Sequence, residues 1–308
     1  MSASPPESPV VSVLICVLNG AAVIGRQLDA LAAQESDVPW EVVVADNGST
    51  DETRELVRGR AAGFPVPLRL VDASARRGVS HARNIAARAA RGRYLAYCDC
   101  DDEVRPGWVT AAGHALSGAP AIAGVNREML DPPRPDAPVL NPQVLGGVGT
   151  LQGCNFGVRR DVFFEIGGFD ESLPPYGNDD GEFAIRLRKA GHQVAAAPDM
   201  EIYFRKTVGV RSRLRKVYNA GLAEIVIWHR HHDPSEPRLR PLGLVRDVAL
   251  WPVLVMVAAL QGQAPSREKI ARGAVLRWAH LVGYFTWIRP DKVGPARLAA
   301  DEPVTELT

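Results

Sequence analysis

Four acidic residues lie within five positions, directly after an apolar segment. Residues 94–98 (YLAYC) have the length and composition of a buried strand, and Asp99, Asp101, Asp102 and Glu103 follow it. Side chains alternate along a strand, so Asp99 and Asp101 are expected to point to the same side. Such a pair suits Mg²⁺ or Mn²⁺ better than Zn²⁺, and Mg²⁺ usually shares its coordination with substrate phosphates. The pattern favours a metal-bridged diphosphate, with a solvated acidic turn as the alternative.

Apolar segments and helical segments alternate around these acids. The expected strands are residues 10–18, 40–45, 68–71 and 94–98, and the expected helices are residues 21–33, a segment from 50 onward, and 78–91. Apolar strands that alternate with helices predict a parallel sheet covered on both faces. Ligands bind beyond the carboxyl ends of the strands in such sheets, and Asn19, Asp46 and Asp99 fall at these ends. The sequence therefore predicts one site at this edge of an α/β fold.

Several common binding functions find no support in the composition or the motifs. No G-x-G-x-x-G follows the first strand and no P-loop is present. The formal net charge of +1 gives no general attraction for nucleic acid, so no such partner is expected. The four cysteines lack C-x-x-C spacing and are expected to be buried free thiols, with a metal or disulfide role as the alternative. With no signal peptide recognised, these features favour a cytoplasmic location.

A second group of acids begins a predicted helix farther along the chain. Asp179, Asp180 and Glu182 would lie in its first turn, and Phe183 and Leu187 would pack. Acids in the first turn are also ordinary partners of the helix dipole, and this is the simpler alternative.

The chain resembles the family 2 glycosyltransferases, which have the GT-A fold. The resemblance covers roughly residues 10–200, and its blocks occur in the family's order. They are CVLN at 16–19, VADNGSTD at 44–51, GVSHARN at 78–84, DCDD at 99–102, GGFD at 167–170, and DD at 179–180 followed by RL at 186–187. The resemblance implies a three-layer α/β/α domain with a mostly parallel central sheet and a C-terminal helical appendage.

The resemblance also implies how a nucleotide-diphosphate sugar would bind. Asp46 resembles the acid that reads the base, while Asn19 and Arg83 belong to blocks at the nucleotide pocket. Asp99 resembles the residue near the ribose and a contributor to the metal site. Asp101 resembles the Mg²⁺ or Mn²⁺ ligand at the diphosphate. The segment where family members often place a histidine near the metal has none here, so we name no third metal ligand.

The acids that begin the predicted helix near residue 180 supply the remaining step, the removal of a proton from the acceptor. Asp180 matches the general base of the family's Glu-Asp pair, and Asp179 replaces the Glu. A carboxylate can take the proton of an acceptor hydroxyl as the new bond forms. We therefore expect an inverting, metal-dependent hexosyltransferase, acting in cell-envelope polysaccharide, glycolipid or secondary-metabolite glycosylation. The alternatives are a non-catalytic nucleotide-sugar-binding or scaffold protein and a GT-A-like nucleotidyltransferase.

We expect three regions along the chain. Residues 1–9 form a disordered tail, and residues 10–205 form the glycosyltransferase domain, with a nucleotide-binding half at about 10–130 and an acceptor half at about 143–205. Residues 206–308 form a helical region.

Two apolar segments in this last region predict a contact surface. Residues 248–260 are uninterrupted apolar sequence, shorter than the ~20 residues of a membrane-spanning helix. Residues 274–288 carry tryptophan and tyrosine, which suit a membrane interface. We expect peripheral contact with the cytoplasmic face of a membrane, with a homodimer contact or a packed helical pair as alternatives.

Overall fold

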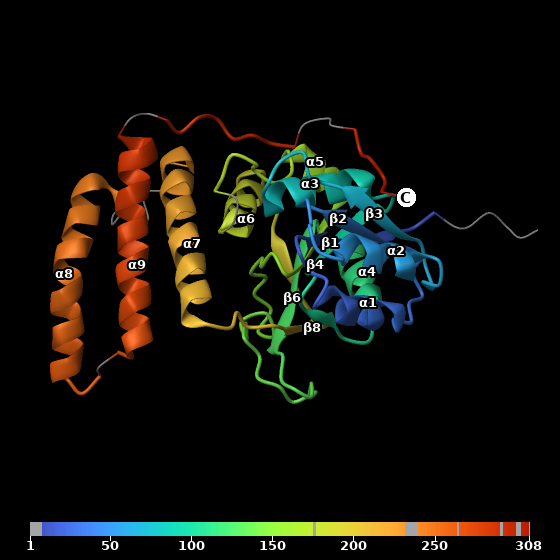
Figure 1. The fold of residues 1–308 in the computed structure, drawn as a ribbon, viewed down its shortest axis with the longest axis horizontal. Helices are drawn as coiled ribbons and strands as arrows, with labels where there is room; N and C mark the ends of the chain where they lie inside the picture. The colour runs from blue at the N-terminus through green and yellow to red at the C-terminus, as the bar shows by residue number, and fades with distance from the viewer. Residues whose placement is uncertain are drawn as a thin grey trace, which may run out of the picture. The chain divides into compact units, whose positions relative to one another are not determined.

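The fold comes from a computed structural model that describes residues 8–174, 177–231, 239–263, 265–289, 292–299 and 303–307 (Figure 1). Residues 1–7 of the predicted disordered tail lie outside the described residues. The chain divides into two compact units. One comprises residues 1–171, 180–206 and 298–308, and the other comprises residues 172–179 and 207–297.

The first unit is built on an eight-stranded sheet in the order β3-β2-β1-β4-β7-β6-β8-β5. The first four strands in this order are mutually parallel, β7 runs against both of its neighbours, and β8 is parallel to β6 but antiparallel to β5. The mostly parallel sheet predicted from the sequence is confirmed. The strands are β1 (Val11–Val17), β2 (Trp40–Asp46), β3 (Leu68–Asp72), β4 (Tyr94–Asp99), β5 (Glu103–Val104), β6 (Ala121–Glu128), β7 (Asn155–Arg159) and β8 (Val194–Phe204).

Helices cover both faces of this sheet because its central strands are apolar on both faces. Val13 and Ile15 of β1 belong to one buried cluster, and Leu14 belongs to the other. The first cluster includes residues of α1 (Ile24–Ala32), α2 (Thr53–Ala61) and α4 (Trp108–Gly118). The second includes residues of α3 (Val79–Ala89), α5 (Arg160–Glu165) and α6 (Asp179–Lys189). The predicted three-layer α/β/α arrangement is therefore confirmed.

A cluster of aromatic rings fixes α6 on the sheet. Tyr97 of β4 stacks on Phe156 of β7 with ring centroids 4.6 Å apart. Phe183 of α6 stacks on Phe169 at 4.5 Å, and Phe163 of α5 lies 5.7 Å from Phe183. All five rings are buried, and such ring pairs add stability beyond the area they bury. Phe183 lies one turn into α6, so its packing in this cluster also fixes the position of the start of the helix.

The last described residues extend the sheet unit at strand β3. The Leu307 N–H donates to the Leu70 carbonyl at 2.8 Å, and the Asp72 N–H donates to the Thr305 carbonyl at 2.9 Å. Glu306 accepts a 2.9 Å hydrogen bond from Nε of Arg69. The C-terminal segment therefore pairs with an edge strand whose N–H and C=O groups would otherwise face solvent.

The second unit is helical, as the sequence predicts for the C-terminal region. It contains α7 (Val210–His231), α8 (Pro241–Leu260), α9 (Arg267–Gly283) and a π-helical turn, Tyr284–Ile288, and α9 packs against both α7 and α8. The predicted apolar segment 248–260 is the C-terminal part of α8, which begins at Pro241 and is 20 residues long. The apolar run alone underestimates the length of this helix. Asp247 interrupts the apolar pattern, but it lies within the helix because it is paired with Arg277 inside the unit.

Candidate active site

Three polar residues predicted to share an edge follow neighbouring strands of the sheet. In the register of the parallel strands, Val17 of β1 is opposite Asp46 of β2, and Cys16 is opposite Asp99 of β4. Asn19 lies two residues beyond the end of β1. The carboxyl ends of these strands therefore bring the three residues to one edge of the sheet.

Asp46 is a buried acid in which one carboxylate oxygen accepts three hydrogen bonds and the other has no partner among the described residues. Oδ1 accepts hydrogen bonds from the N–H groups of Gly48 and Ser49, both at 2.8 Å, and from Arg54 at 2.9 Å. Burial opposes the charge on Asp46, but the hydrogen bonds from Arg54, Ser49 and Gly48 outweigh it and lower the pKa below 3.8. Oδ2 is buried and has no partner among the described residues. The structure thus leaves one oxygen of this carboxylate without a hydrogen bond from the part of the chain that it describes.

Asn19 joins two of the strand-end loops. It has a left-handed backbone conformation (φ 54°), and its side-chain oxygen accepts a 2.8 Å hydrogen bond from the Thr50 N–H. The Asn19 N–H in turn donates to the Ser49 hydroxyl at 2.9 Å. These contacts give Asn19 a structural role between the loops after β1 and β2, and its predicted contact with the donor stays a prediction.

Three carboxylates gather directly after β4. Oxygen atoms of Asp99, Asp101 and Asp102 lie within 4.8 Å of one another. The strand ends at Asp99 and a turn follows, so strand alternation, which we expected to align Asp99 with Asp101, does not apply beyond Asp99. The turn brings the acids together instead and adds Asp102 to the group. Three hard oxygen donors fit Mg²⁺ or Mn²⁺.

Asp102 is the most buried of the three acids. Its Oδ1 accepts a 2.8 Å hydrogen bond from the N–H of Arg205, the residue that follows β8, and its Oδ2 is buried without a partner among the described residues. Burial, followed by the charge of Asp99, raises the pKa of Asp102 to about 9 despite the Arg205 hydrogen bond. A divalent cation would reverse this balance, because it supplies the positive charge that the group lacks.

Arg83 and the Gly153 peptide connect this acidic group to Asp180. Arg83 is buried in α3, where its guanidinium lies 3.7 Å from Oδ1 of Asp99 and donates to the Gly153 carbonyl at 3.0 Å. The Gly153 N–H donates to Oδ2 of Asp180 at 3.0 Å. A Cβ at position 153 would lie 2.5 Å from the guanidinium, so glycine allows this close approach. The network places Asp180, at the first turn of α6, near the acids after β4.

Three residues of the site were not predicted from the sequence. Arg54 pairs with Asp46, Asp102 joins the other two acids, and Gly153 links Arg83 to Asp180. Asp102 could have been noticed as the third acid of the DCDD block. Arg54 and Gly153 carry no sequence signal, because their roles depend on which loops meet in the folded chain.

Comparisons with known proteins agree with this architecture. The family model described as glycosyl transferase family 2 matches residues 12–167, about half of the chain, and a model described as the N-terminal domain of galactosyltransferase matches residues 143–208. The glycosyltransferase AglE of Haloferax volcanii is 28% identical over 231 residues, which are 71% of this chain and 74% of AglE. The validoxylamine A glucosyltransferase of a Streptomyces hygroscopicus strain is 25% identical over 78% of this chain and 64% of the relative.

Solved structures show the same fold at low sequence identity. A mannosyltransferase from Pyrobaculum calidifontis, in complex with GDP-Man and Mn²⁺, has a TM-score of 0.65 at 22% identity and covers 92% of this chain and 88% of its own. Staphylococcus aureus TarS 1–349 with UDP-GlcNAc has a TM-score of 0.53 at 19% identity over 90% of this chain and 89% of its own. The fold is GT-A, and the chain belongs to glycosyl transferase family 2 and is a glycosyltransferase.

Proposed function

We propose that this protein is an inverting, metal-dependent hexosyltransferase that moves a sugar from a nucleoside-diphosphate sugar to an acceptor hydroxyl. The main observation in support is the connection from the Asp99, Asp101 and Asp102 group through Arg83 and Gly153 to Asp180. Such a site offers acids for a metal and a separate acid for the acceptor. A cytoplasmic location belongs to the same proposal.

The donor side of the proposal uses the edge after β2 and β4. The unpartnered oxygen of Asp46 would accept an N–H of the base, and Asp99 would lie at the ribose. Asp101, with Asp99 and Asp102 beside it, would hold Mg²⁺ or Mn²⁺. The metal would neutralise the charge of the leaving diphosphate. The Pyrobaculum mannosyltransferase, which was solved with GDP-Man and Mn²⁺, supports this assignment.

The acceptor side uses Asp180. Its carboxylate would take the proton of the acceptor hydroxyl while the acceptor oxygen bonds to the anomeric carbon and the bond to the diphosphate breaks. Attack from the side opposite the leaving group inverts the anomeric centre. The Gly153 N–H, together with the Gly181 N–H at 2.8 Å, would fix the direction of the carboxylate.

A panel of nucleotide sugars tests this proposal. Release of free nucleotide is measured for UDP-, GDP- and dTDP-sugars, with and without Mn²⁺, in the presence of simple hydroxyl acceptors. We expect free nucleotide to be released from one of these donors, and we expect this release to need Mn²⁺. If a nucleotide sugar bound to the protein but no donor were turned over, the result would instead favour a non-catalytic binding protein.

The base is tested with Asp180→Asn and a matched control. Asp180→Asn should reduce turnover at least a thousandfold while donor affinity stays within about twofold, because a base acts on the reaction rather than on donor binding. Asp199→Asn makes the same chemical change at an exposed position of β8 and should leave turnover unchanged. Wild-type turnover by Asp180→Asn would remove Asp180 from the mechanism.

A further inference from the structure

Helix α8 exposes an apolar surface that the proposed transferase site does not use. Within the part of the chain that the structure describes, it is the one helix long and apolar enough to cross a membrane, with a mean hydropathy of 1.8 and only 11% of that window buried. Large apolar patches of this kind on a soluble surface usually mark a contact site. We define the α8 face by its exposed apolar residues, which are Leu242, Val245, Val248, Leu250, Val253, Leu254, Met256, Val257 and Leu260.

The opposite side of α8 packs on α9. Asp247 forms an ion pair with Arg277 at 2.9 Å, and the Arg277 guanidinium lies 3.8 Å from the centre of the Trp251 ring. Gly273 of α9 accommodates the same ring, because a Cβ there would lie 2.2 Å from it. The buried side of α8 is therefore already occupied, and the α8 face points away from α9.

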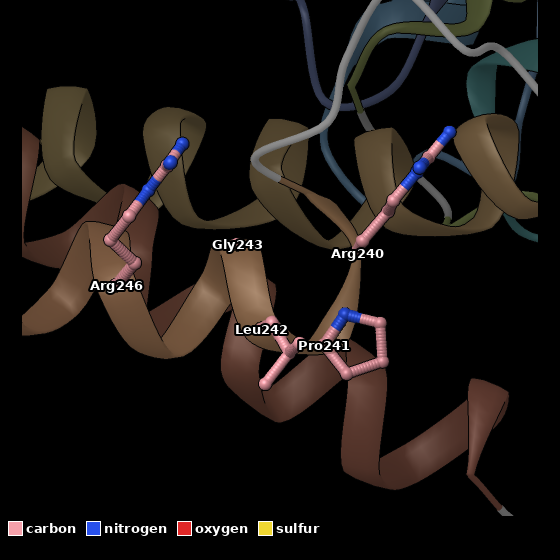
Figure 2. A pocket seen from close by; sticks show the side chains of 5 residues that line it. All are labelled: Arg240, Pro241, Leu242, Gly243 and Arg246. Carbon is pink, nitrogen blue, oxygen red and sulfur yellow. The ribbon is translucent and has the colours of Figure 1, made fainter.

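Arginines near the start of α8 give this face a positive charge. Arg240 precedes the helix and Arg246 lies in its second turn, and both line a shallow hollow of ≈ 470 Å³ with Pro241, Leu242 and Gly243 (Figure 2). In Figure 2 the two arginine side chains extend in the same direction, and Leu242 and Pro241 lie between them along the chain. Arg246 follows Leu242 by four residues, so the two lie on the same face of the helix. Neither arginine forms an ion pair with a described residue, and the one acid of α8, Asp247, is paired with Arg277.

These charges decide between a lipid surface and a second copy of the chain. Burying the α8 face against another α8 would remove Arg246 from water, and α8 offers no free acid to pair with it. An unpaired buried charge is strongly destabilising. At a bilayer surface the long arginine side chain can reach the phosphates while its neighbours enter the acyl region. We propose that the α8 face binds the surface of a bilayer containing anionic lipids.

The partner helix determines how α8 lies on the bilayer. Twenty helical residues span about 30 Å, which equals the hydrocarbon thickness. However, α9 packs along α8 and carries Arg267, Glu268, Lys269, Arg272 and Arg277. Carrying these charges through the hydrocarbon would be costly. Helix α8 therefore lies in the plane of the interface, with its apolar face inward and α9 on the water side.

Vesicle co-sedimentation of the full chain tests this proposal independently of any transferase activity. The probes are vesicles of phosphatidylcholine alone and of phosphatidylcholine with added phosphatidylserine. Binding is expected mainly to the anionic vesicles and should weaken as salt is raised, because about 1 kcal/mol per surface arginine comes from the lipid charge. Arg246→Gln should accordingly weaken binding about fivefold.

Apolar variants and a matched control test the face itself. Leu242→Gln and Val253→Gln should each weaken vesicle binding about tenfold, since each removes an apolar side chain from the acyl region. Val208→Gln makes a similar change at a residue that is 86% exposed but lies outside α8, and it should bind like the wild type.

Three outcomes would overturn the proposal. The first is the absence of binding to anionic vesicles. The second is a dimer in light scattering that Leu242→Gln dissociates, because it would assign the α8 face to a second copy. The third is a membrane-bound chain that resists alkaline carbonate extraction, because it would show that α8 spans the bilayer. Circular dichroism of each variant checks that its helices are intact.

Discussion

Glu171 lies at the end of the GGFDE segment and its carboxylate is almost fully buried. Its side chain is 3% exposed, and it accepts hydrogen bonds from Asn84 at 2.7 Å and Arg76 at 2.8 Å. Nδ1 of His81 lies 3.1 Å from the same carboxylate. Burial opposes the charge, but the contacts with His81, Asn84 and Arg76 outweigh it and lower the pKa of Glu171 from 4.5 to about 2. Replacing Glu171 by Gln therefore tests a buried charged network.

The pKa difference sets the size of the expected effect. A carboxyl group whose pKa falls from 4.5 to about 2 on folding stabilises the folded state by about 3 kcal/mol at neutral pH. Because the folded pKa is the lower one, this contribution is complete above about pH 5 and is lost as the pH falls toward 2, with about half remaining near pH 3. Glu171→Gln should therefore destabilise the protein by roughly 2–4 kcal/mol at pH 7 and by about half as much at pH 3.

Urea unfolding followed by circular dichroism measures this difference at both pH values. Glu165→Gln is the matched control, because Glu165 also contacts a histidine, His192 at 3.1 Å, but its side chain is 55% exposed. This control should change the free energy of unfolding by less than about 0.5 kcal/mol. If Glu171→Gln had the same small effect, or an equal effect at pH 7 and pH 3, the buried-charge reasoning would be refuted.

Three further substitutions test the site and the sheet. Asp46→Asn should weaken nucleotide binding about tenfold or more in calorimetry, because it removes the negative charge of the carboxylate proposed to accept an N–H of the base. Unchanged affinity would exclude Asp46 from the donor site. Asp102→Asn should weaken Mn²⁺ binding about 10- to 100-fold in paramagnetic resonance titrations. If the variant bound Mn²⁺ as tightly as the wild type, Asp102 would have only a structural role, as the acceptor of the Arg205 hydrogen bond. Gly124→Ala should destabilise the fold by roughly 2–4 kcal/mol, because its Cβ would lie 2.2 Å from the Met200 carbonyl oxygen. Gly63→Ala, which meets nothing within 4 Å, is the control for unfolding, and equal stability of the two would contradict the clash.

The parallel half of the sheet could be predicted because its information is local. Strands β1, β2 and β4 are buried on both faces and mostly apolar, with Ser12 and Glu41 as the polar residues inside β1 and β2, and a mostly apolar run between helices has few other solutions. Asp46 and Asp99 end two of those strands, so their common edge followed from the strand assignment alone. The geometry of Asp101 was less predictable, because it depends on a turn and not on the strand.

The remaining features depend on contacts between distant segments. Strand β7 (Asn155–Arg159) is short and contains a glycine, and it is fixed by its pairing with β4 and by the stack of Phe156 on Tyr97. The contact of Asp180 with Gly153 joins a helix to a loop 27 residues earlier. The length of α8 depends on the pairing of Asp247 with Arg277. No local pattern specifies such pairings.

The pairing of residues 303–307 with β3 bears on how firmly a lipid-bound helical unit would retain the catalytic unit. The chain leaves the sheet unit after Glu171 and again after Lys206, and it rejoins the sheet unit at Asp180 and at Leu298, so four connections join the units. A single protease cut near Gly209 would leave the connection at Leu298 intact, and this connection leads to the backbone hydrogen bonds of Thr305 and Leu307 with β3. Release of the enzyme from a membrane would then require further cuts in the remaining connections, including those on either side of residues 172–179, or the dissociation of the segments that they carry.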